Sequence, residues 1–469
     1  MRPVILLFQW LCTSTLAAAQ TCPDYADYAA APHAPFSGGV YNLSYQRPAP
    51  SCRTFTSPAV ESTIARLNST ITDPDLSRLF ENSFPNTLDT AIKWKGYAAD
   101  NADEELTFVI TGDMYTPPSE SGLPPSINSA ATNDVVTPSY ANTTVYECKY
   151  ELDSLAAFLE ISTDYYTATN DLAFFSKYSW VAAVQAVLNT AQSMTISTYA
   201  ANGSVNTLPY TFQRLTTSAE DTLANKGTGN PVQNGTDLIR SAFRPSDDAC
   251  IYQFFIPANM MFAHQLNTTS ALLTAMGTAN STDLATELTA LSASLSAAIT
   301  RHGIFPDPVH GAVYAYEVDG YGGRNIMDDA NIPSLLSAPL IGYLAQNDSV
   351  YQATRALLLS ADTDPYFMRG PVIDAVGGPH DGPGFAWPMA SIVRIFTSGD
   401  DGELAGSLKE LVGSTDGLGG WSACDVFPFI FFFFFCERLY KTDQPTFHPT
   451  GLIHESVNTF DQSHYTRPW

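Results

Sequence analysis

The sequence predicts an all-α protein in which paired helices close into an α/α toroid. Three observations support this fold class. About ten segments have helical periodicity or helix-capping residues, whereas strand signals are few. Some of these segments are apolar almost all round, which suits the inner helices of a toroid. The connections between them are long and rich in aspartate and aromatic residues. The sequence has no short-period repeat, which argues against a solenoid.

The first two helices are each expected to begin at a capping residue followed by proline. Ser57 precedes Pro58, and Asp73 precedes Pro74. A side-chain oxygen at the N-cap accepts one of the unpaired amide hydrogens of the first turn. Proline suits the first helical position because it has no N–H to leave unpaired there.

The rest of the chain is expected to be helical over much of its length. In the segment 150–161, Leu152, Leu155, Ala156 and Leu159 fall on one helical face. Further helices are expected in 171–194, 247–266 (interrupted at Pro257), 284–299, 333–345, 348–360, 384–398 and 403–413.

Residues 1–19 have the composition of a secretory signal peptide, with Arg2 before an apolar stretch and a run of alanines at the expected cleavage site. Residues 20–469 are expected to form a single toroid domain. Secretion agrees with the presence of N-x-S/T sequons. These predict glycosylation at Asn42, Asn68, Asn142, Asn202, Asn234, Asn267, Asn280 and Asn347.

The charge balance limits the possible partners. Asp and Glu number 47 and Lys and Arg 22, which gives a net charge of −25. Such a chain repels nucleic acids and anionic membranes, so neither is expected as a partner. Beyond the signal peptide, no segment has the roughly 20 apolar residues that a membrane-spanning helix needs.

Four loops share an unusual composition of acids, an Arg or His, and an aromatic residue. They are 241–249, 316–334, 377–389 and 452–469. Carboxylates and guanidinium groups bind sugar hydroxyls, and an aromatic ring covers the face of a sugar, so this composition is typical of a carbohydrate site.

Each of these motifs also fits a structural role when it is taken alone. Asp247 and Asp248 fit capping residues for a following helix, because acids favour helix N-termini. The "DGYGG" and "MDDAN" stretches fit ordinary turns, and His380 and Glu455 fit solvated loop residues. The functional interpretation rests on four separate loops having the same composition.

Other site classes lack their signatures. Asp319, Asp328 and Asp329 do not have the spacing of an EF-hand, and no HExxH zinc motif is present. No glycine-rich motif follows a strand, and no G-x-S-x-G elbow occurs. We therefore expect neither a metal nor a cofactor.

Across these loops the sequence resembles glycoside hydrolase family 125, secreted and secretory-pathway exo-α-1,6-mannosidases with an (α/α)6 toroid fold. The resemblance runs in order over nearly the whole chain after the signal peptide. It rests on "NTLDT" (86–90), "ITGDM" (110–114), "ECKYELDSLAAFL" (147–159), "RPSDDA" (244–249), "EVDGYG" (317–322), "NIMDDANIPSLLSAP" (325–339), "GPH" (378–380), "WPM" (387–389), "HESVN" (454–458) and "TRPW" (466–469).

The resemblance implies inverting hydrolysis of α-mannoside glycans without a metal. Either Asp247 or Asp248 matches the general acid, and the sequence does not decide between them. Glu455 matches the general base that activates water on the opposite face of the sugar. The residues expected to bind mannose are Arg244, Asp319, Asp328, Asp329, His380, Trp387, His454 and Arg467.

The sequence departs from the family pattern at two places. At 115–116 the "TGD" motif passes directly to a proline-rich loop, where the family has about two more helices that include a "WLRDS"-type motif. Residues 420–449 stand where the family passes directly to the "HES" motif, and they contain five consecutive phenylalanines. We interpret 420–449 as a retained intron and 115–116 as the trace of a skipped exon, so the toroid is expected to be incomplete.

Two disulfides are expected in a secreted chain of this family. Cys148 and Cys250 each adjoin a family motif that should line the same end of the toroid, which predicts one bridge. A second bridge, Cys22–Cys52, would hold the N-terminal segment.

The sequence leaves three functions to compare. The first is an inverting exo-α-1,6-mannosidase, which would release mannose from its substrate. The second is a relative without catalysis, either a carbohydrate-binding protein or an inactive splice product. The third is another chemistry of toroid proteins, such as polysaccharide lyase activity, which would leave an unsaturated sugar.

Overall fold

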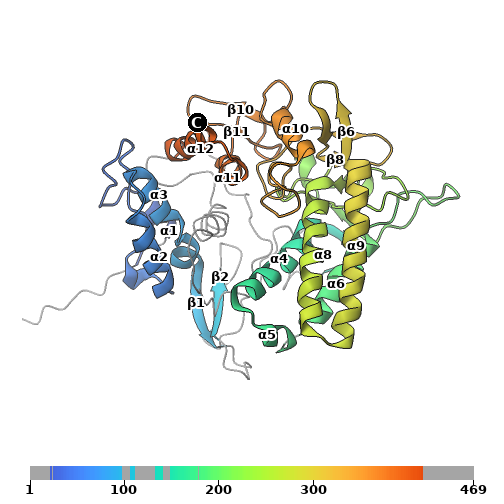
Figure 1. The fold of residues 1–469 in the computed structure, drawn as a ribbon, viewed down its shortest axis with the longest axis horizontal. Coiled ribbons are helices and arrows are strands. Elements are labelled where there is room, and N and C mark those ends of the chain that lie inside the picture. Colours follow the sequence, from blue (N-terminus) through green and yellow to red (C-terminus); the bar gives the residue numbers. More distant parts are fainter. Residues whose placement is uncertain are drawn as a thin grey trace, which may run out of the picture.

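A computed structural model describes residues 22–23, 25–97, 106–110, 133–140, 148–177 and 179–415. The expected signal peptide, the 115–116 junction, the 420–449 segment and the sequon at Asn142 lie outside these residues. Helices dominate the described part of the chain (Figure 1). They are α1 (Tyr25–Ala29), α2 (Pro58–Asn68), α3 (Pro74–Ser83), α4 (Leu152–Thr169), α5 (Leu172–Lys177), α6 (Trp180–Ser193), α7 (Ala224–Gly227), α8 (Ile256–Met276), α9 (Ala279–Gly303), α10 (Ser349–Leu358), α11 (Pro388–Thr397) and α12 (Asp401–Gly413), with shorter helical turns η1 (Pro50–Cys52), η2 (Thr87–Ala91) and η3 (Ala219–Asp221).

Helices α2 and α3 begin where the capping residues predict. The Ser57 side chain accepts the amide N–H of Val60, and the Asp73 carboxylate accepts that of Leu76. The Cys22–Cys52 disulfide is formed just before α2, as expected, with the two Cα atoms 5.4 Å apart. These local bonds hold the N-terminal segment against the first helices.

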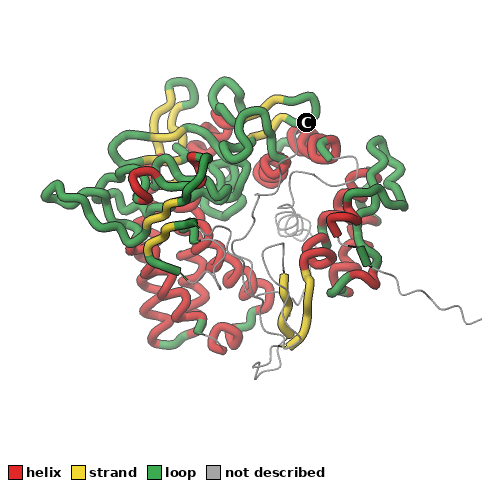
Figure 2. Tube along the Cα trace, turned by 180° about the vertical axis from the view of Figure 1, so that it is seen from behind, coloured by secondary structure: helices red, strands yellow, loops and turns green. Residues whose placement is uncertain are grey.

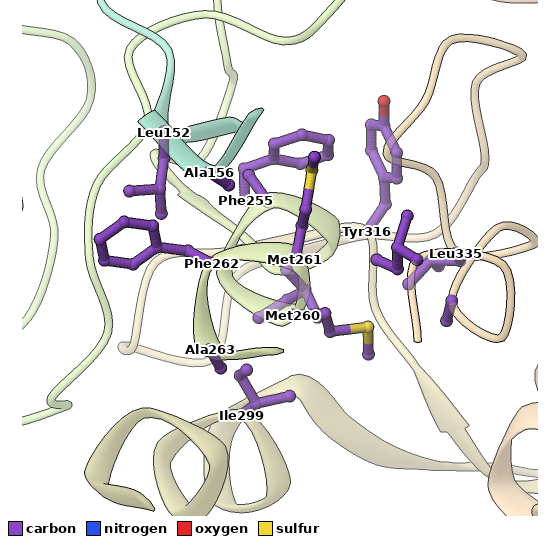
Figure 3. Packing of buried hydrophobic residues seen from close by; sticks show 14 of the residues in the cluster. Leu152, Ala156, Phe255, Met260, Met261, Phe262, Ala263, Ile299, Tyr316 and Leu335 are labelled. Carbon is purple, nitrogen blue, oxygen red and sulfur yellow. The ribbon is translucent and has the colours of Figure 1, made fainter. Parts of the chain in front are cut away.

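Helices α8 and α9 stand side by side and, with α4, form the centre of the core (Figure 1). Helix α8 is buried on nearly all sides, as an apolar inner helix should be. Figure 3 shows Phe262 of α8 close to Leu152 of α4, and Met261 of α8 on the side of Tyr316. Of the predicted face of α4, Leu152, Ala156 and Leu159 are buried and Leu155 is partly buried.

The last described helices lie beside the first ones. Helix α11 packs on α12, and α12 contacts α3 (Figure 1). Leu79 of α3, Val412 of α12 and Leu43 form a small separate apolar cluster. The two ends of the described chain are therefore joined through their side chains.

The loops contain short strands that the sequence did not predict. Most of them lie among the long connections rather than among the helices (Figure 2). The described strands pair as small antiparallel sheets, in the order β1-β2, β3-β4, β5-β8-β9, β6-β7 and β10-β11. They are β1 (Ile92–Tyr97), β2 (Leu106–Ile110), β3 (Val135–Thr137), β4 (Thr211–Gln213), β5 (Phe254–Phe255), β6 (Ile304–Asp307), β7 (Gly311–Tyr314), β8 (Glu317–Val318), β9 (Arg324–Asn325), β10 (Phe367–Arg369) and β11 (Asp374–Val376).

Two expected helices begin or break differently from the prediction. The segment 171–194 forms two helices, α5 and α6, and the rings of Phe175 and Trp180 pack against each other across the break with centroids 4.7 Å apart. In 247–266, Pro257 lies in the first turn of α8 and does not interrupt it. Proline suits the first turn of a helix because the amides of that turn have no hydrogen-bond acceptor within the helix.

The helix expected in 333–345 is wrong. This segment forms a series of turns. The carboxylate of Asp328 accepts the amide hydrogens of Leu335 and Leu336, at 2.8 and 2.9 Å. Pro339 has no N–H for a helical bond and would clash with the preceding turn.

None of the described helices is both long and apolar enough to cross a membrane. Of the sequon asparagines that are described, Asn68 is partly buried and the others are exposed. Glycosylation at these asparagines stays a prediction.

Candidate active site

The "RPSDDA" motif forms a tight turn that points its two aspartates in different directions. The amide of Arg244 donates to the carbonyl of Asp248, and the amide of Asp247 donates to the carbonyl of Arg244. Asp247 has a left-handed φ of 64°, which aspartate tolerates better than most residues. The next helix, α8, begins at Ile256, so neither aspartate caps it.

Asp248 points into the protein and meets His380 from a distant loop. The Asp248 Oδ1 atom lies 2.9 Å from Nδ1 of His380. The Asp248 side chain is 3% exposed, and its Oδ2 atom has no hydrogen-bond partner in the protein. One carboxyl oxygen is thus held, and the other is buried without a hydrogen-bond partner in the protein.

Arg244 is paired with Glu317, a residue for which the sequence analysis proposed no role. Its Nε donates to Glu317 Oε1 at 2.7 Å, and the two side chains are 2% and 0% exposed. Glu317 lies on β8, and pairing with Phe255 of β5 fixes it opposite the start of α8. The guanidinium also lies over the ring of Tyr316, and its Nη2 has no partner in the protein.

Asp328 and Asp329 have separate tasks. Asp328 folds its own loop by accepting the two amides described above. Asp329 accepts the amide and the side-chain N–H of Asn331 with Oδ1, whereas its Oδ2 has no partner in the protein. Burial raises the pKa of Asp329 to about 6, against the opposing effects of Asn331 and the Arg244 charge.

The loop that carries His380 lies directly on Asp329. A Cβ atom at Gly378 would meet Asp329 Oδ2 at 2.9 Å, which is closer than real Cβ atoms come. Glycine at this position therefore allows the loop between β11 and α11 to approach, and it brings His380 within reach of Asp248.

A second acidic group borders the turn on the side of Asp247. It consists of Glu151 and Asp153 at the start of α4, together with Asp247. Burial, with the negative charge of Asp247, raises the pKa of both Glu151 and Asp153. The amide of Leu152 donates to Ser241 Oγ at 2.9 Å, which ties this helix end to the turn.

Three loops expected from the sequence therefore meet, and they gather unpartnered polar atoms of both kinds. Asp248 Oδ2 and Asp329 Oδ2 are acceptors, Arg244 Nη2 is a donor, and the Tyr316 hydroxyl is both. Buried polar groups normally have partners, so this set indicates a ligand rich in hydroxyl groups. In the described residues, no three His, Cys, Asp or Glu side chains are arranged to hold a metal ion.

Comparison with known proteins agrees with this chemistry. A family model described as metal-independent α-mannosidase (GH125) matches residues 73–116 and 114–422, well over half of the chain. The chain belongs to this family. It is thus a glycoside hydrolase of the α-mannosidase type.

Two known relatives of this α-mannosidase show how far the similarity extends. The meiotically up-regulated gene 157 protein of Schizosaccharomyces pombe (strain 972 / ATCC 24843) is 38% identical over 499 aligned positions, which cover 96% of this chain and 90% of the relative. A solved Streptococcus pneumoniae structure is 27% identical with a TM-score of 0.67 and covers 78% of this chain and 91% of that one. It is described as a metal-independent α-mannosidase in a non-productive substrate complex with α-1,6-mannobiose.

Two of the residues expected to bind mannose, Asp319 and Asp328, use their carboxylates to hold their own loops in this α-mannosidase. Asp319 folds the β8–β9 hairpin by accepting the amides of Tyr321 and Gly323 at 2.7 and 2.8 Å. Trp387 is 7% exposed at the start of α11, and its expected part in sugar binding stays a prediction. His454 and Arg467, which were also expected to bind mannose, and Glu455, the expected general base, lie outside the described residues.

The expected Cys148–Cys250 bridge is not formed, and this prediction is wrong. Both cysteines are free thiols. Cys250 is buried among Glu317, Arg244 and the acids of α4, whereas Cys148 is half-buried, and burial together with the charge of Asp134 raises the pKa of its thiol. The two thiols therefore lie in different surroundings.

Sequence reasoning missed Glu317, Glu151 and Asp153. All three lie inside motifs that carried the family resemblance, "EVDGYG" and "ECKYELDS". The sequence feature that could have identified two of them is the pair of acids, Glu151 and Asp153, in "ECKYELDS". Such a pair at a helix start also fits capping, so only the surrounding structure reveals that both carboxyls are buried beside the site.

Proposed function

We propose that this α-mannosidase is an inverting exo-α-1,6-mannosidase with Asp248 as its general acid. The observation that carries the proposal is the state of the Asp248 carboxyl. It is buried, one oxygen is bound to His380, and the other is unpartnered beside Arg244 and Asp329. A buried carboxyl with one open oxygen is suited to deliver a proton to a glycosidic oxygen.

The mechanism assigns separate tasks to the two carboxylates. Asp248 protonates the glycosidic oxygen as the bond to mannose C1 breaks. Glu455, from the "HES" motif, takes a proton from the water that attacks C1 on the opposite face. Inversion requires room for that water, so the two carboxyls should be about 6.5–9.5 Å apart.

Arg244 and Asp329 are proposed to bind mannose hydroxyls with the atoms that lack protein partners. The Arg244 Nη2 donates, and Asp329 Oδ2 accepts or, when protonated, donates. Both groups are held rigidly, Arg244 by Glu317 and Asp329 by Asn331. Rigid donors and acceptors fit the sugar in one orientation. Because these side chains are already ordered, they lose little conformational entropy when the sugar binds.

The proposed linkage rests on the solved relative, which was captured with α-1,6-mannobiose. The proposed exo action and the (α/α)6 toroid follow the family resemblance. The fold supports a ring, because the helices follow one another around the molecule and α12 comes back to α3 (Figure 1).

We also propose that a segment has been lost at residues 115–116 and that residues 420–449 are an insert. The two matched pieces of the family model meet at residues 114–116, the expected junction. The alignment with the yeast relative spans 499 positions, more than the 469 residues of this chain, so the relative has residues without a counterpart here. Sequencing the transcript across codons 110–120 and 415–455 tests both proposals, and a genomic sequence without splice signals there would contradict them.

Secretion, or residence in the secretory pathway, is proposed on the composition of residues 1–19 and on the exposed sequons. A mature protein that starts near residue 20 and shifts in mass after glycosidase treatment is the expected result.

The activity itself is tested with mannobioses of defined linkage. We expect α-1,6-mannobiose to be hydrolysed faster than the α-1,2 and α-1,3 isomers, with no loss of rate in a chelator. Asp248→Asn should lower kcat by about 10²–10⁴, the usual contribution of general acid catalysis. Mannose binding without turnover would instead favour a carbohydrate-binding protein, and an unsaturated product would favour a lyase.

A further inference from the structure

The contact between His380 and Asp248 links two loops that are far apart in the sequence. The Nδ1 and Oδ1 atoms are 2.9 Å apart, and the side chains are 24% and 3% exposed. The contact has two possible forms: a ring hydrogen on Nδ1 donates to Oδ1, or a carboxyl hydrogen on Oδ1 donates to Nδ1. In the first form the neutral ring has its hydrogen on Nδ1, which is the less common tautomer of histidine, and the acidic hydrogen of Asp248 is left to Oδ2.

We propose that His380 is a positioning residue that reserves Asp248 Oδ2 for the transferable proton. This inference rests on the proposed function, in which Asp248 is the general acid. With Nδ1–H bound to Oδ1, the acidic hydrogen resides on Oδ2, the oxygen without a partner in the protein. His380 therefore acts through Asp248, which is a different task from binding a mannose hydroxyl.

The proposed step balances without any further reactant. The hydrogen on Oδ2 passes to the glycosidic oxygen as the C1–O bond breaks, and the bonding pair stays with that oxygen. Water forms the new C1–O bond and gives a proton to the base. The Asp248 carboxylate left behind keeps its bond from His380 Nδ1–H, and hydrogen bonds to ionised groups are stronger than those to neutral ones.

The same bond favours the transition state over the bound substrate. Negative charge develops on Asp248 only as its proton leaves, so the His380 hydrogen bond strengthens during the step. An interaction that is stronger in the transition state raises kcat, whereas one of equal strength throughout changes only binding. Losing a hydrogen bond to a charged group therefore predicts a fall in kcat of about ten- to hundredfold.

Several charged groups surround the pair, and they determine which measurement is decisive. Asp381 comes from the loop of His380, Asp329 from the loop after β9, and Arg244 from the turn of Asp248 itself. All of these groups contribute to a pH profile, so a shifted profile alone would not identify His380. The position of the ring hydrogen and the dependence on the leaving group do identify it.

The chain offers a matched control in His310. Its Nδ1 also lies 2.9 Å from an aspartate Oδ1, that of Asp307, but this pair is on the turn between β6 and β7. A general effect of breaking a histidine–aspartate pair should appear at both sites. An effect on the general acid should appear at His380 alone.

The first test locates the hydrogen by nitrogen NMR of the full chain labelled with ¹⁵N-histidine. The signals of His380 are assigned by their loss in His380→Asn. We expect Nδ1 to carry the hydrogen in the neutral ring, and Asp248→Leu to move it to Nε2 without changing the signals of His310. A neutral His380 ring with hydrogen on Nε2, or no response to Asp248→Leu, would overturn the proposal.

The second test compares two leaving groups. Hydrolysis of α-1,6-mannobiose needs the general acid, whereas α-mannosyl fluoride has a leaving group that needs little protonation. His380→Leu should slow the mannobiose reaction by about ten- to hundredfold and the fluoride reaction only a few-fold. His380→Asn should restore most of the loss, because its amide N–H lies near the position of Nδ1. His310→Leu should show no such difference between substrates.

Equal slowing of both substrates by His380→Leu would show that His380 binds the sugar and does not position the acid. If neither the unchanged full chain nor a chain with residues 420–449 removed and the segment at 115–116 restored hydrolyses either substrate, the proposed function fails. The nitrogen spectrum still decides the position of the ring hydrogen in that case.

Discussion

The buried Arg244–Glu317 pair provides a strong test of how the site is built. Glu317→Gln keeps the size of the side chain and removes its negative charge. The pair is 2.7 Å long with exposures of 2% and 0%, so water cannot solvate the arginine that remains. Glu317 Oε2 also accepts the amide of Tyr252 at 3.2 Å, a bond that the glutamine carbonyl can keep.

The expected loss follows from these contacts. Removing one partner of a buried pair costs about 3–5 kcal/mol, because it leaves an uncompensated charge. One retained hydrogen bond offsets about 1 kcal/mol. We therefore expect Glu317→Gln to lower the free energy of unfolding by about 2–4 kcal/mol, a large share of the ~5–15 kcal/mol of a typical domain.

Urea unfolding followed by circular dichroism measures this loss. The control is Asp237→Asn, which breaks the exposed Arg301–Asp237 pair, 4.0 Å long with side chains 53% and 54% exposed. Surface pairs contribute at most about 1 kcal/mol, so this variant should change little. Replacing both partners, as in Arg244→Met with Glu317→Leu, should cost less than Glu317→Gln alone. A Glu317→Gln variant no less stable than the Asp237→Asn control would refute the reasoning.

Further predictions concern protonation and the cysteines. Burial raises the pKa of Asp364 to about 7, so between about pH 4 and 7 the folded protein holds a proton that the unfolded chain has released. The free energy of unfolding should therefore fall as pH rises through this window, and less steeply in Asp364→Asn; identical slopes in thermal melts would contradict this. In the folded protein a thiol reagent should label half-buried Cys148 before buried Cys250, and a peptide containing both as a disulfide would show that the bridge exists after all. Selective reduction of the Cys22–Cys52 disulfide, which joins residues 30 positions apart, should lower the free energy of unfolding by about 3–4 kcal/mol. An unchanged melting temperature after reduction would argue against this stabilisation.

Local chemistry made the helix starts predictable, whereas long-range contacts decided the elements that were missed. Ser57 and Asp73 cap their helices with their own side chains, so the sequence alone contains the cause. The segment 333–345 has helical periodicity, but Asp328 takes two of its amides. No propensity reveals such competition, because it depends on how the preceding loop folds.

The same distinction applies to the site. The motifs identified Asp248, Arg244 and His380 as candidates, because their composition suits a sugar. Their pairing was not predictable, since Arg244 meets Glu317 across 73 positions and Asp248 meets His380 across 132. Which of the two adjacent aspartates is buried depends on the left-handed turn at Asp247.

The most direct test of the central claim is the configuration of the first mannose released. Proton NMR of α-1,6-mannobiose mixed with the full chain distinguishes the two anomers before they interconvert. An inverting mechanism, with Asp248 as acid and Glu455 as base, predicts that β-mannose appears first. Initial α-mannose would mean retention through a covalent intermediate, and it would contradict the roles assigned to both carboxylates.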